Sequence, residues 1–149
     1  MKKKILAFVF DGKRFLALRN NPKDPAHGGD YWFTVSGAVE SGEDCEDAVN
    51  REVKEETGLK VIRVFDLNWG SVYAWNNEDN LERNFIAFVK PGRVLLSEEH
   101  IDYAWLDLTN FIKRIHWGLG ITELSAVLKK GINRENHFRI LKIDEFRKK

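Results

Sequence analysis

The chain has 149 residues, of which 43% are hydrophobic, and this is enough for one folded domain that buries roughly 70% of its unfolded surface. A formal net charge of +1 excludes a general positive field for nucleic acid, so an anionic ligand has to be held by local groups. The single cysteine, Cys45, excludes an internal disulfide and fits a reducing compartment.

The first ten residues place three lysines before an apolar run, an order that also occurs in secretion signals. The run, residues 5–10, is too short for such a signal, and no small-residue cleavage site follows it. No stretch approaches the roughly 20 apolar residues of a membrane span. We therefore expect a cytoplasmic protein that begins with a β-strand and has no membrane partner.

Strand-like and turn-like segments alternate through the first part of the chain. Residues 5–10 and 14–18 are expected strands, and Asp11-Gly12 between them is a hairpin signal. Residues 20–30 are rich in Pro, Gly and Asn and are expected to form a loop. Residues 31–35 alternate aromatic and β-branched side chains, which predicts a third strand.

Residues 36–59 read SGAVESGEDCEDAVNREVKEETGL, a loop that leads into a helix. Ser41 or Asp44 can cap this helix, and Gly58 stops it. At about 100° per residue, one arc of the helix is wholly polar. This arc contains Asp44, Asp47, Asn50, Arg51, Lys54 and Thr57. The opposite arc, which is expected to face the protein body, contains Cys45, Ala48, Val49, Val53 and the three glutamates Glu52, Glu55 and Glu56.

The three glutamates occupy positions i, i+3 and i+4, so their side chains converge on one patch. A solvated charge run is the ordinary interpretation of such a group, but an inward patch of carboxylates is costly unless the charges are neutralised. Clustered carboxylate oxygens are the ligands that magnesium and manganese prefer. We therefore expect a divalent cation, Mg²⁺ or Mn²⁺, as the cofactor.

The rest of the chain returns to strands and ends in helices. Residues 61–75, 81–90 and 104–106 are expected strands, with Gly70 marking a bulge or bend in the first. Residues 111–115, capped by Thr109, and 122–129, closed by Gly131, are expected helices, and residues 133–149 fit a strand or a short helix. We expect a single α+β domain over residues 1–149, with a mixed β-sheet and packed helices.

The glutamate segment resembles the Nudix hydrolase signature, G-x5-E-x7-R-E-U-x-E-E-x-G-U, where U is aliphatic. Every fixed position is matched, over about a sixth of the chain. The matching residues are Gly37, Glu43, Arg51, Glu52, Val53, Glu55, Glu56, Gly58 and Leu59. The resemblance implies the Nudix α/β/α sandwich and a metal-dependent hydrolase of pyrophosphate linkages.

The resemblance also implies roles for individual residues. Glu55 and Glu56 correspond to metal ligands, and Glu52 to a ligand or to the base that positions water. The carbonyl of Ser36 corresponds to a further ligand, although many family members have glycine there. Arg51 would brace the acidic residues, and its partner or outer-shell contact would be Glu43. Gly37 would let the chain turn tightly beside the cation.

A further carboxylate is expected from the loop before the last strand. The pattern E-H-x-x-x-x-W, which starts at Glu99 and ends at Trp105, resembles a loop of several Nudix subgroups. It implies that Glu99 assists the metal or the water, and an exposed acidic turn is the alternative. His100 either assists proton transfer or is only a surface group.

Substrate contacts are less well indicated by the sequence. Trp69, Tyr73 and Trp75 alternate along one expected strand, so all three could face the same side and stack on a planar base. A sheet face packed on a helix is the alternative. Arg19 ends a strand beside the 20–30 loop, where it could meet a phosphate or remain a surface group.

The expected reaction is attack of metal-activated water on a diphosphate linked to a group X. The segments YWFTVSGAVESGE and SEEHIDYAWLDL resemble those of dihydroneopterin triphosphate and deoxynucleoside triphosphate pyrophosphohydrolases, which favours a nucleoside triphosphate-like substrate. Dinucleoside polyphosphates, ADP-sugars and a non-catalytic ligand sensor remain alternatives. An isomerase of this fold needs a reactive cysteine, whereas Cys45 is expected to pack inward. Many relatives are dimers, so a homodimer is also open.

Overall fold

Strand β1 (Lys2–Phe10) is the central element of the sheet. The computed structural model describes residues 1–24, 29–75, 77–118 and 120–135, apart from the side chain of Trp75. β1 pairs in parallel with β6 (Glu78–Val89) along its whole length. Its other edge pairs antiparallel with β2 (Phe15–Asn20) and β4 (Val35–Ala38). The predicted hairpin between β1 and β2 is confirmed, because Asp11 Oδ1 accepts from the backbone of Lys13 and Arg14.

The described strands form one mixed sheet in the order β3-β2-β1-β6-β5, in which β4 pairs with β1 and β7 with β2. The remaining strands are β3 (Trp32–Phe33), β5 (Val61–Trp75) and β7 (His100–Leu106). β7 begins four residues earlier than expected, because the polar residues at its start pair with β2 through their backbone. Glu99 therefore directly precedes the first residue of β7.

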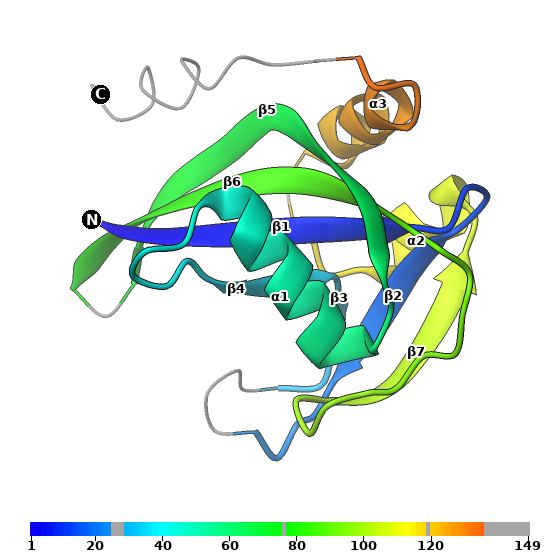
Figure 1. The fold of residues 1–149 in the computed structure, drawn as a ribbon, viewed down its shortest axis with the longest axis horizontal. Helices are drawn as coiled ribbons and strands as arrows, with labels where there is room; N and C mark the ends of the chain where they lie inside the picture. The colour runs from blue at the N-terminus through cyan, green and yellow to red at the C-terminus, as the bar shows by residue number, and fades with distance from the viewer. Residues whose placement is uncertain (25–28, 76, 119, 136–149) are drawn as a thin grey trace.

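The two faces of the sheet are covered by different helices (Figure 1). Side chains alternate along β1, so Ile5, Ala7 and Val9 pack in one core cluster with α1 (Cys45–Thr57). Leu6 and Phe8 pack on the other face with α2 (Leu108–Arg114) and α3 (Ile121–Ile132). The predicted α+β architecture, a sheet sandwiched between helices, is confirmed.

The ends of α1 follow the sequence closely. Asp44 is the N-cap, and its side chain accepts from the Asp47 backbone at 2.8 Å, so the cap is Asp44 and not Ser41. Gly58 ends the helix with a φ of 71°, a left-handed conformation that glycine adopts without strain. These two ends fix which residues of α1 face the sheet.

In α2 and α3, by contrast, one predicted helix end each is wrong. Asp107, and not Thr109, caps α2, and its Oδ1 accepts from the backbone of Asn110 at 2.8 Å. Gly131 lies inside α3, whose last residue is Ile132 and whose C-cap is Asn133. A Cβ at Gly131 would lie 2.6 Å from Cδ2 of Leu67, so this glycine provides close packing of the helix on β5 and does not end the helix. Of the ambiguous C-terminal stretch, residues 136–149 lie outside the described part.

The irregularity that Gly70 predicted begins slightly earlier in β5. The pairing register with β6 shifts between Asp66 and Trp69, and Asn68 has a φ of 50°. Gly70 follows this bulge, and a Cβ there would overlap the carbonyl oxygen of Glu82 on β6. The glycine thus allows two backbones to approach closely after the bulge.

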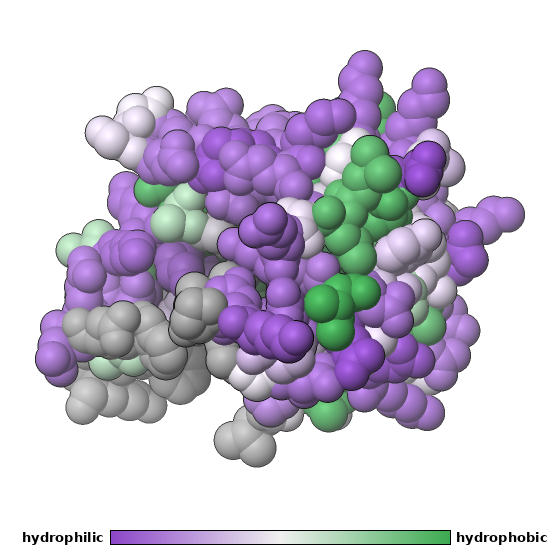
Figure 2. Space-filling model, turned by 90° about the horizontal axis from the view of Figure 1, so that it is seen from below, coloured by the Kyte–Doolittle hydropathy of each residue, from purple (hydrophilic) through white to green (hydrophobic). Residues whose placement is uncertain are grey.

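None of the described helices is long and apolar enough to cross a membrane. Figure 2 shows one face of the molecule as largely hydrophilic, with hydrophobic side chains gathered in one patch. Exposed large hydrophobic residues of the chain include Ile62, Leu95 and Ile101. A homodimer and the cytoplasmic location stay predictions.

Replacing Gly70 with alanine should destabilise the protein by about 1–3 kcal/mol, because the added methyl group forces the β5 and β6 backbones apart. Urea unfolding followed by tryptophan fluorescence measures this loss. Ser71→Ala, at the exposed neighbouring position, should change the midpoint little. A Gly70→Ala protein as stable as the Ser71→Ala protein would contradict the close approach.

Candidate active site

Glu56 is the most deeply buried charged side chain of α1. It is 4% exposed, and its Oε2 has no hydrogen-bond partner among the described residues. Burial, a hydrogen bond with Glu99 and the charges of Glu52 and Glu99 together raise the pKa of the Glu56 carboxyl to about 10, against which the Ser36 backbone bond acts. A carboxylate in this position requires either a proton or a cation.

The loop before β7 supplies the groups opposite Glu56. Ligand atoms of Glu56, Glu99 and His100 lie within 4.8 Å of one another, close enough for one metal ion to touch all three. They adjoin a pocket of about 310 Å³. Its lining residues are Glu52, Glu55, Glu56, Ser97, Glu98 and Glu99. Carboxylate oxygens and an imidazole nitrogen suit Mg²⁺ or Mn²⁺, so these residues fit the expected cofactor.

Glu52 lies beside this group, one turn earlier on α1, with a side chain that is 13% exposed. Burial raises the pKa of its carboxyl, while the hydrogen bond from Arg51 lowers it. Gly37 lies directly against this carboxylate, because a Cβ at Gly37 would overlap the Glu52 side chain. Gly37 is an extended residue of β4 paired with Ile5, so its role is close approach and the expected tight turn is wrong.

Arg51 connects the acidic residues of the helix to the loop that precedes it. Its guanidinium donates to both oxygens of Glu43, at 2.9 and 2.8 Å, and to the Ala38 carbonyl at 2.9 Å. It also donates to Oε1 of Glu52 at 2.8 Å. The Arg51 hydrogen bonds and a backbone bond from Glu40 lower the pKa of Glu43 to about 2. The expected bracing pair of Arg51 and Glu43 is therefore present.

The inward arc expected for α1 is correct for two glutamates and wrong for the third. Glu55 is 58% exposed and lies at the rim of the pocket. Thr57, which was expected on the wet arc, is fully buried, and its hydroxyl donates to the Val53 carbonyl at 2.6 Å. Arg51 was also expected there and instead folds over the site. The buried face of α1 is thus centred closer to Glu52 and Glu56 than the periodicity of the sequence predicted.

Ser36 brings a backbone group to the site. Its N–H donates to the Glu56 carboxylate. In an extended strand the N–H and C=O of one residue point the same way, so the Ser36 carbonyl also faces the Glu56 side. This placement is compatible with the carbonyl ligand that was expected.

The expected substrate residues lie outside the carboxylate pocket. Arg19 forms a two-pronged ion pair with Asp30, at 2.9 and 2.7 Å, so a phosphate would have to displace Asp30. Trp69 and Tyr73 pair with Asn84 and Asn80 and share the sheet face opposite α1. The Trp75 side chain lies outside the described part.

Trp69 and Tyr73 already have contacts of their own. The ring of Trp69 lies 5.5 Å from that of Trp117 and packs against the core. The hydroxyl of Tyr73 donates to Glu82 at 3.5 Å, and burial raises the pKa of Tyr73 to about 12. Both residues are partly exposed, so packing and base contact are compatible for them.

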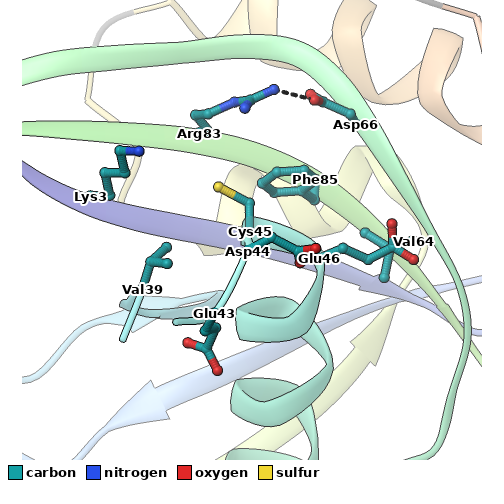
Figure 3. A pocket seen from close by; sticks show the side chains of 10 residues that line it. All are labelled: Lys3, Val39, Glu43, Asp44, Cys45, Glu46, Val64, Asp66, Arg83 and Phe85. Carbon is teal, nitrogen blue, oxygen red and sulfur yellow. Dashed lines mark hydrogen bonds and ion pairs between the residues drawn. The ribbon is translucent and has the colours of Figure 1, made fainter. Parts of the chain in front are cut away.

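A second pocket, of about 520 Å³, lies at the N-terminal end of α1 and shares no lining residue with the carboxylate pocket. Figure 3 shows Arg83 paired with Asp66 above Cys45, and Glu43 pointing away from them. Glu43 is held by Arg51, so three charged groups of this pocket, Glu43, Asp66 and Arg83, are paired within the protein. Among the described residues, those that line it include no group of three whose ligand atoms lie close enough to share a metal ion.

Sequence reasoning did not assign His100 to the metal group or Asn21 to any role. His100 follows Glu99 directly, so the pattern E-H was the available signal, but only the strand pairing of β7 shows that both residues reach Glu56. Asn21 donates to two carbonyls of the Glu99 loop, 77 residues away in the case of Glu98, and the sequence carries no signal for that contact.

The profile of the NUDIX domain matches residues 2–121 of the chain. Because this match covers well over half of the chain, the chain belongs to the Nudix family. The profile covers the whole sheet, α1 and α2.

Among known relatives, the dihydroneopterin triphosphate diphosphatase of Escherichia coli strain K12 is 32% identical over 117 residues, covering 69% of this chain and 75% of that protein. The NAD-capped RNA hydrolase NudC of Mannheimia succiniciproducens is 36% identical over 105 residues, covering 68% of this chain. The chain spans only 38% of the length of that NudC. In structure, the MutT protein from Methanosarcina mazei Go1 has a TM-score of 0.67 at 23% identity, over 89% of this chain and 93% of that one.

Without metal, the protein should lose stability as the pH rises. The Glu56 carboxyl has an ordinary pKa of 4.5 that folding raises to about 10, so its contribution is fully present below pH 4.5 and is lost as the pH rises toward 10. One such group changes stability by at most about 1.4 kcal/mol per pH unit, or up to about 3–5 °C in Tm. Thermal melts in EDTA between pH 5 and 9 measure this slope.

Glu56→Gln should flatten the slope, whereas Glu46→Gln, at an exposed position of the same helix, should keep it. The low pKa of Glu43 does not interfere, because its effect falls below pH 4.5. Equal slopes for the wild type and Glu56→Gln would show that Glu56 is not the buried group described.

Proposed function

We propose that the chain hydrolyses a pyrophosphate linkage in a nucleoside triphosphate-like substrate, with Mg²⁺ or Mn²⁺ as its cofactor. The observation that carries the proposal is the Glu56 carboxylate, buried next to Glu99 with one oxygen that no described residue satisfies. A proton would also neutralise Glu56, but it would leave the other carboxylates of the pocket uncompensated. A divalent cation neutralises both Glu56 and Glu99, and carboxylate oxygens are the ligands that such a cation prefers.

Glu56 and Glu99 would hold the cation, with His100 and the Ser36 carbonyl as further ligands. Glu55, at the exposed rim, would hold a second ion. When bound, the metal neutralises the charge of the pyrophosphate and lowers the pKa of a bound water. The clustered acidic groups alone would repel such a substrate, which makes the cation a requirement for binding as well.

Glu52 is the residue best placed to accept the proton of the attacking water. Burial raises the pKa of its carboxyl above the ordinary value, which brings it closer to the pH at which a general base is effective. Arg51 holds its Oε1 at 2.8 Å, and Gly37 leaves room for it. The other carboxylate oxygen would then receive the proton.

The distance between Ser36 and Trp69 supports a substrate as long as a nucleotide. Ser36, Leu6, Asn84 and Trp69 are successive cross-strand neighbours on β4, β1, β6 and β5, so they form one row across the sheet. Three strand spacings amount to about 14 Å. A triphosphate at Glu56 whose base passes the β4 edge onto the face opposite α1 would bring that base near Trp69, whose ring packs on Trp117 but stays partly exposed.

The relatives point to the same class of substrate. The name of dihydroneopterin triphosphate diphosphatase describes action on a free triphosphate, and the name of NudC describes hydrolysis of NAD-capped RNA. Of these two relatives, the diphosphatase is matched over the larger share of its own length, 75%. This supports a free triphosphate, such as a pterin or deoxynucleoside triphosphate, over other substrates.

Glu56→Gln and Glu99→Gln should each lower hydrolysis by more than the roughly 10–100-fold that loss of an outer-shell partner costs. Glu55→Gln should have a smaller effect, because Glu55 is exposed. The assay measures pyrophosphate and phosphate released from a deoxynucleoside triphosphate with Mg²⁺. Glu46→Gln serves as the control on the same helix. Near-native turnover of Glu56→Gln, or hydrolysis that persists in EDTA, would overturn the assigned chemistry.

A substrate panel should show the highest kcat/KM with a pterin or deoxynucleoside triphosphate. The panel also contains a dinucleoside tetraphosphate and an ADP-sugar, and each product is identified by chromatography. A higher kcat/KM with either of these would replace the substrate proposal but keep the reaction. Tight binding without hydrolysis of any compound would favour a ligand sensor instead.

A further inference from the structure

We propose that Asn21 is a positioning residue that holds Glu99 opposite Glu56. The inference rests on the role proposed above for Glu99. Asn21 directly follows β2, and its backbone N–H donates to the Glu99 carbonyl at 2.9 Å. Its side-chain Nδ2 donates to the Glu98 carbonyl at 3.0 Å. One residue thus binds two successive carbonyls of the loop that carries the acidic group.

The amide of Asn21 is itself fixed by its own loop. Its Oδ1 accepts from the Lys23 backbone at 3.0 Å, and its main-chain carbonyl accepts from the Asp24 backbone at 3.0 Å. Both ends of the side-chain amide are therefore used, the oxygen in a local turn and the nitrogen on the Glu98 carbonyl. This arrangement leaves the amide little freedom to rotate or to release the loop.

This clamp, the two bonds from Asn21 to the Glu98 and Glu99 carbonyls, acts where the pairing of β2 with β7 is irregular. The register between β2 and β7 shifts between Arg19 and Asn20, and the last pair before the loop is Asn20 with His100. Beyond that point the backbone of Glu98 and Glu99 is held by Asn21 and by the bond from His100 N to the Ser97 carbonyl, 3.3 Å long. Glu99 and Glu56 repel each other when both are ionised, so a loosely held loop would move Glu99 away.

Asn20 provides a matched control, because it has the same side chain one residue earlier. Its Nδ2 donates to the Gly29 carbonyl at 2.8 Å, within the β2–β3 connection, and at 3.5 Å to the carbonyl of Asn21, whereas the bonds to Glu98 and Glu99 come from Asn21. Asn20 is buried, so its replacement also reports the general cost of loosening this connection. Comparing variants of Asn21 and Asn20 therefore separates the effect of the clamp on the metal site from the stability of the β2–β3 connection.

The decisive variant is Asn21→Asp, which keeps the oxygen that binds the Lys23 backbone but replaces the donor to Glu98 with an acceptor. Binding of Mn²⁺ alone, followed by electron paramagnetic resonance of the substrate-free protein, should weaken roughly 10–100-fold, as for other groups that orient metal ligands. At saturating substrate, the Mn²⁺ concentration needed for half-maximal hydrolysis should rise by the same factor. Asn20→Ala should lower Tm but keep the wild-type Mn²⁺ affinity.

A double-mutant cycle with Glu99→Gln tests whether Asn21 acts through Glu99. In the Glu99→Gln background, Asn21→Asp should cause no further loss of Mn²⁺ affinity. Wild-type Mn²⁺ affinity in Asn21→Asp, equal losses in Asn20→Ala, or full additivity in the cycle would each overturn the clamp while leaving the proposed function intact. A wild type that neither binds Mn²⁺ nor hydrolyses any substrate would overturn both.

Discussion

A carboxylate that is 4% exposed and has a second carboxylate beside it destabilises a folded protein unless positive charge compensates it. The packing of α1 imposes this burial. Val49 and Val53 are fully buried against the sheet, and Glu56 follows Val53 by three residues on the same side of the helix. The helix therefore cannot bury its apolar residues without also burying Glu56.

The residues around the acidic group hold its side chains close together. Arg51 neutralises part of the charge at one end, where it joins Glu43, the Ala38 carbonyl and Glu52. Gly37 allows Glu52 to lie against β4, and the Ser36 N–H satisfies part of Glu56. No described cation reaches the other end, where Glu56 faces Glu99. Arg51 thus compensates the negative charge at one end of the site, and the Glu56–Glu99 end is where a metal ion would supply the positive charge.

The sequence predicted those features that depend on local spacing. The capping of α1 by Asp44, the stop at Gly58 and the hairpin at Asp11 all follow from residues within one turn of each other. The exposure of Glu55 and the burial of Thr57 did not follow, because a 100° periodicity cannot fix the rotation of a helix on its sheet to within one residue. The inclusion of His100 and the contact of Asn21 depend on the pairing of β2 with β7, which brings residues about 80 positions apart together.

Glu56 and Glu99 together form the proposed site for a divalent cation. A crystal soaked in Mn²⁺ and measured at a wavelength where manganese scatters anomalously tests it directly. An anomalous peak within roughly 2.0–2.3 Å of a carboxylate oxygen of both Glu56 and Glu99 is the expected result. A peak elsewhere on the surface, or none at Glu56 under saturating Mn²⁺, would contradict it.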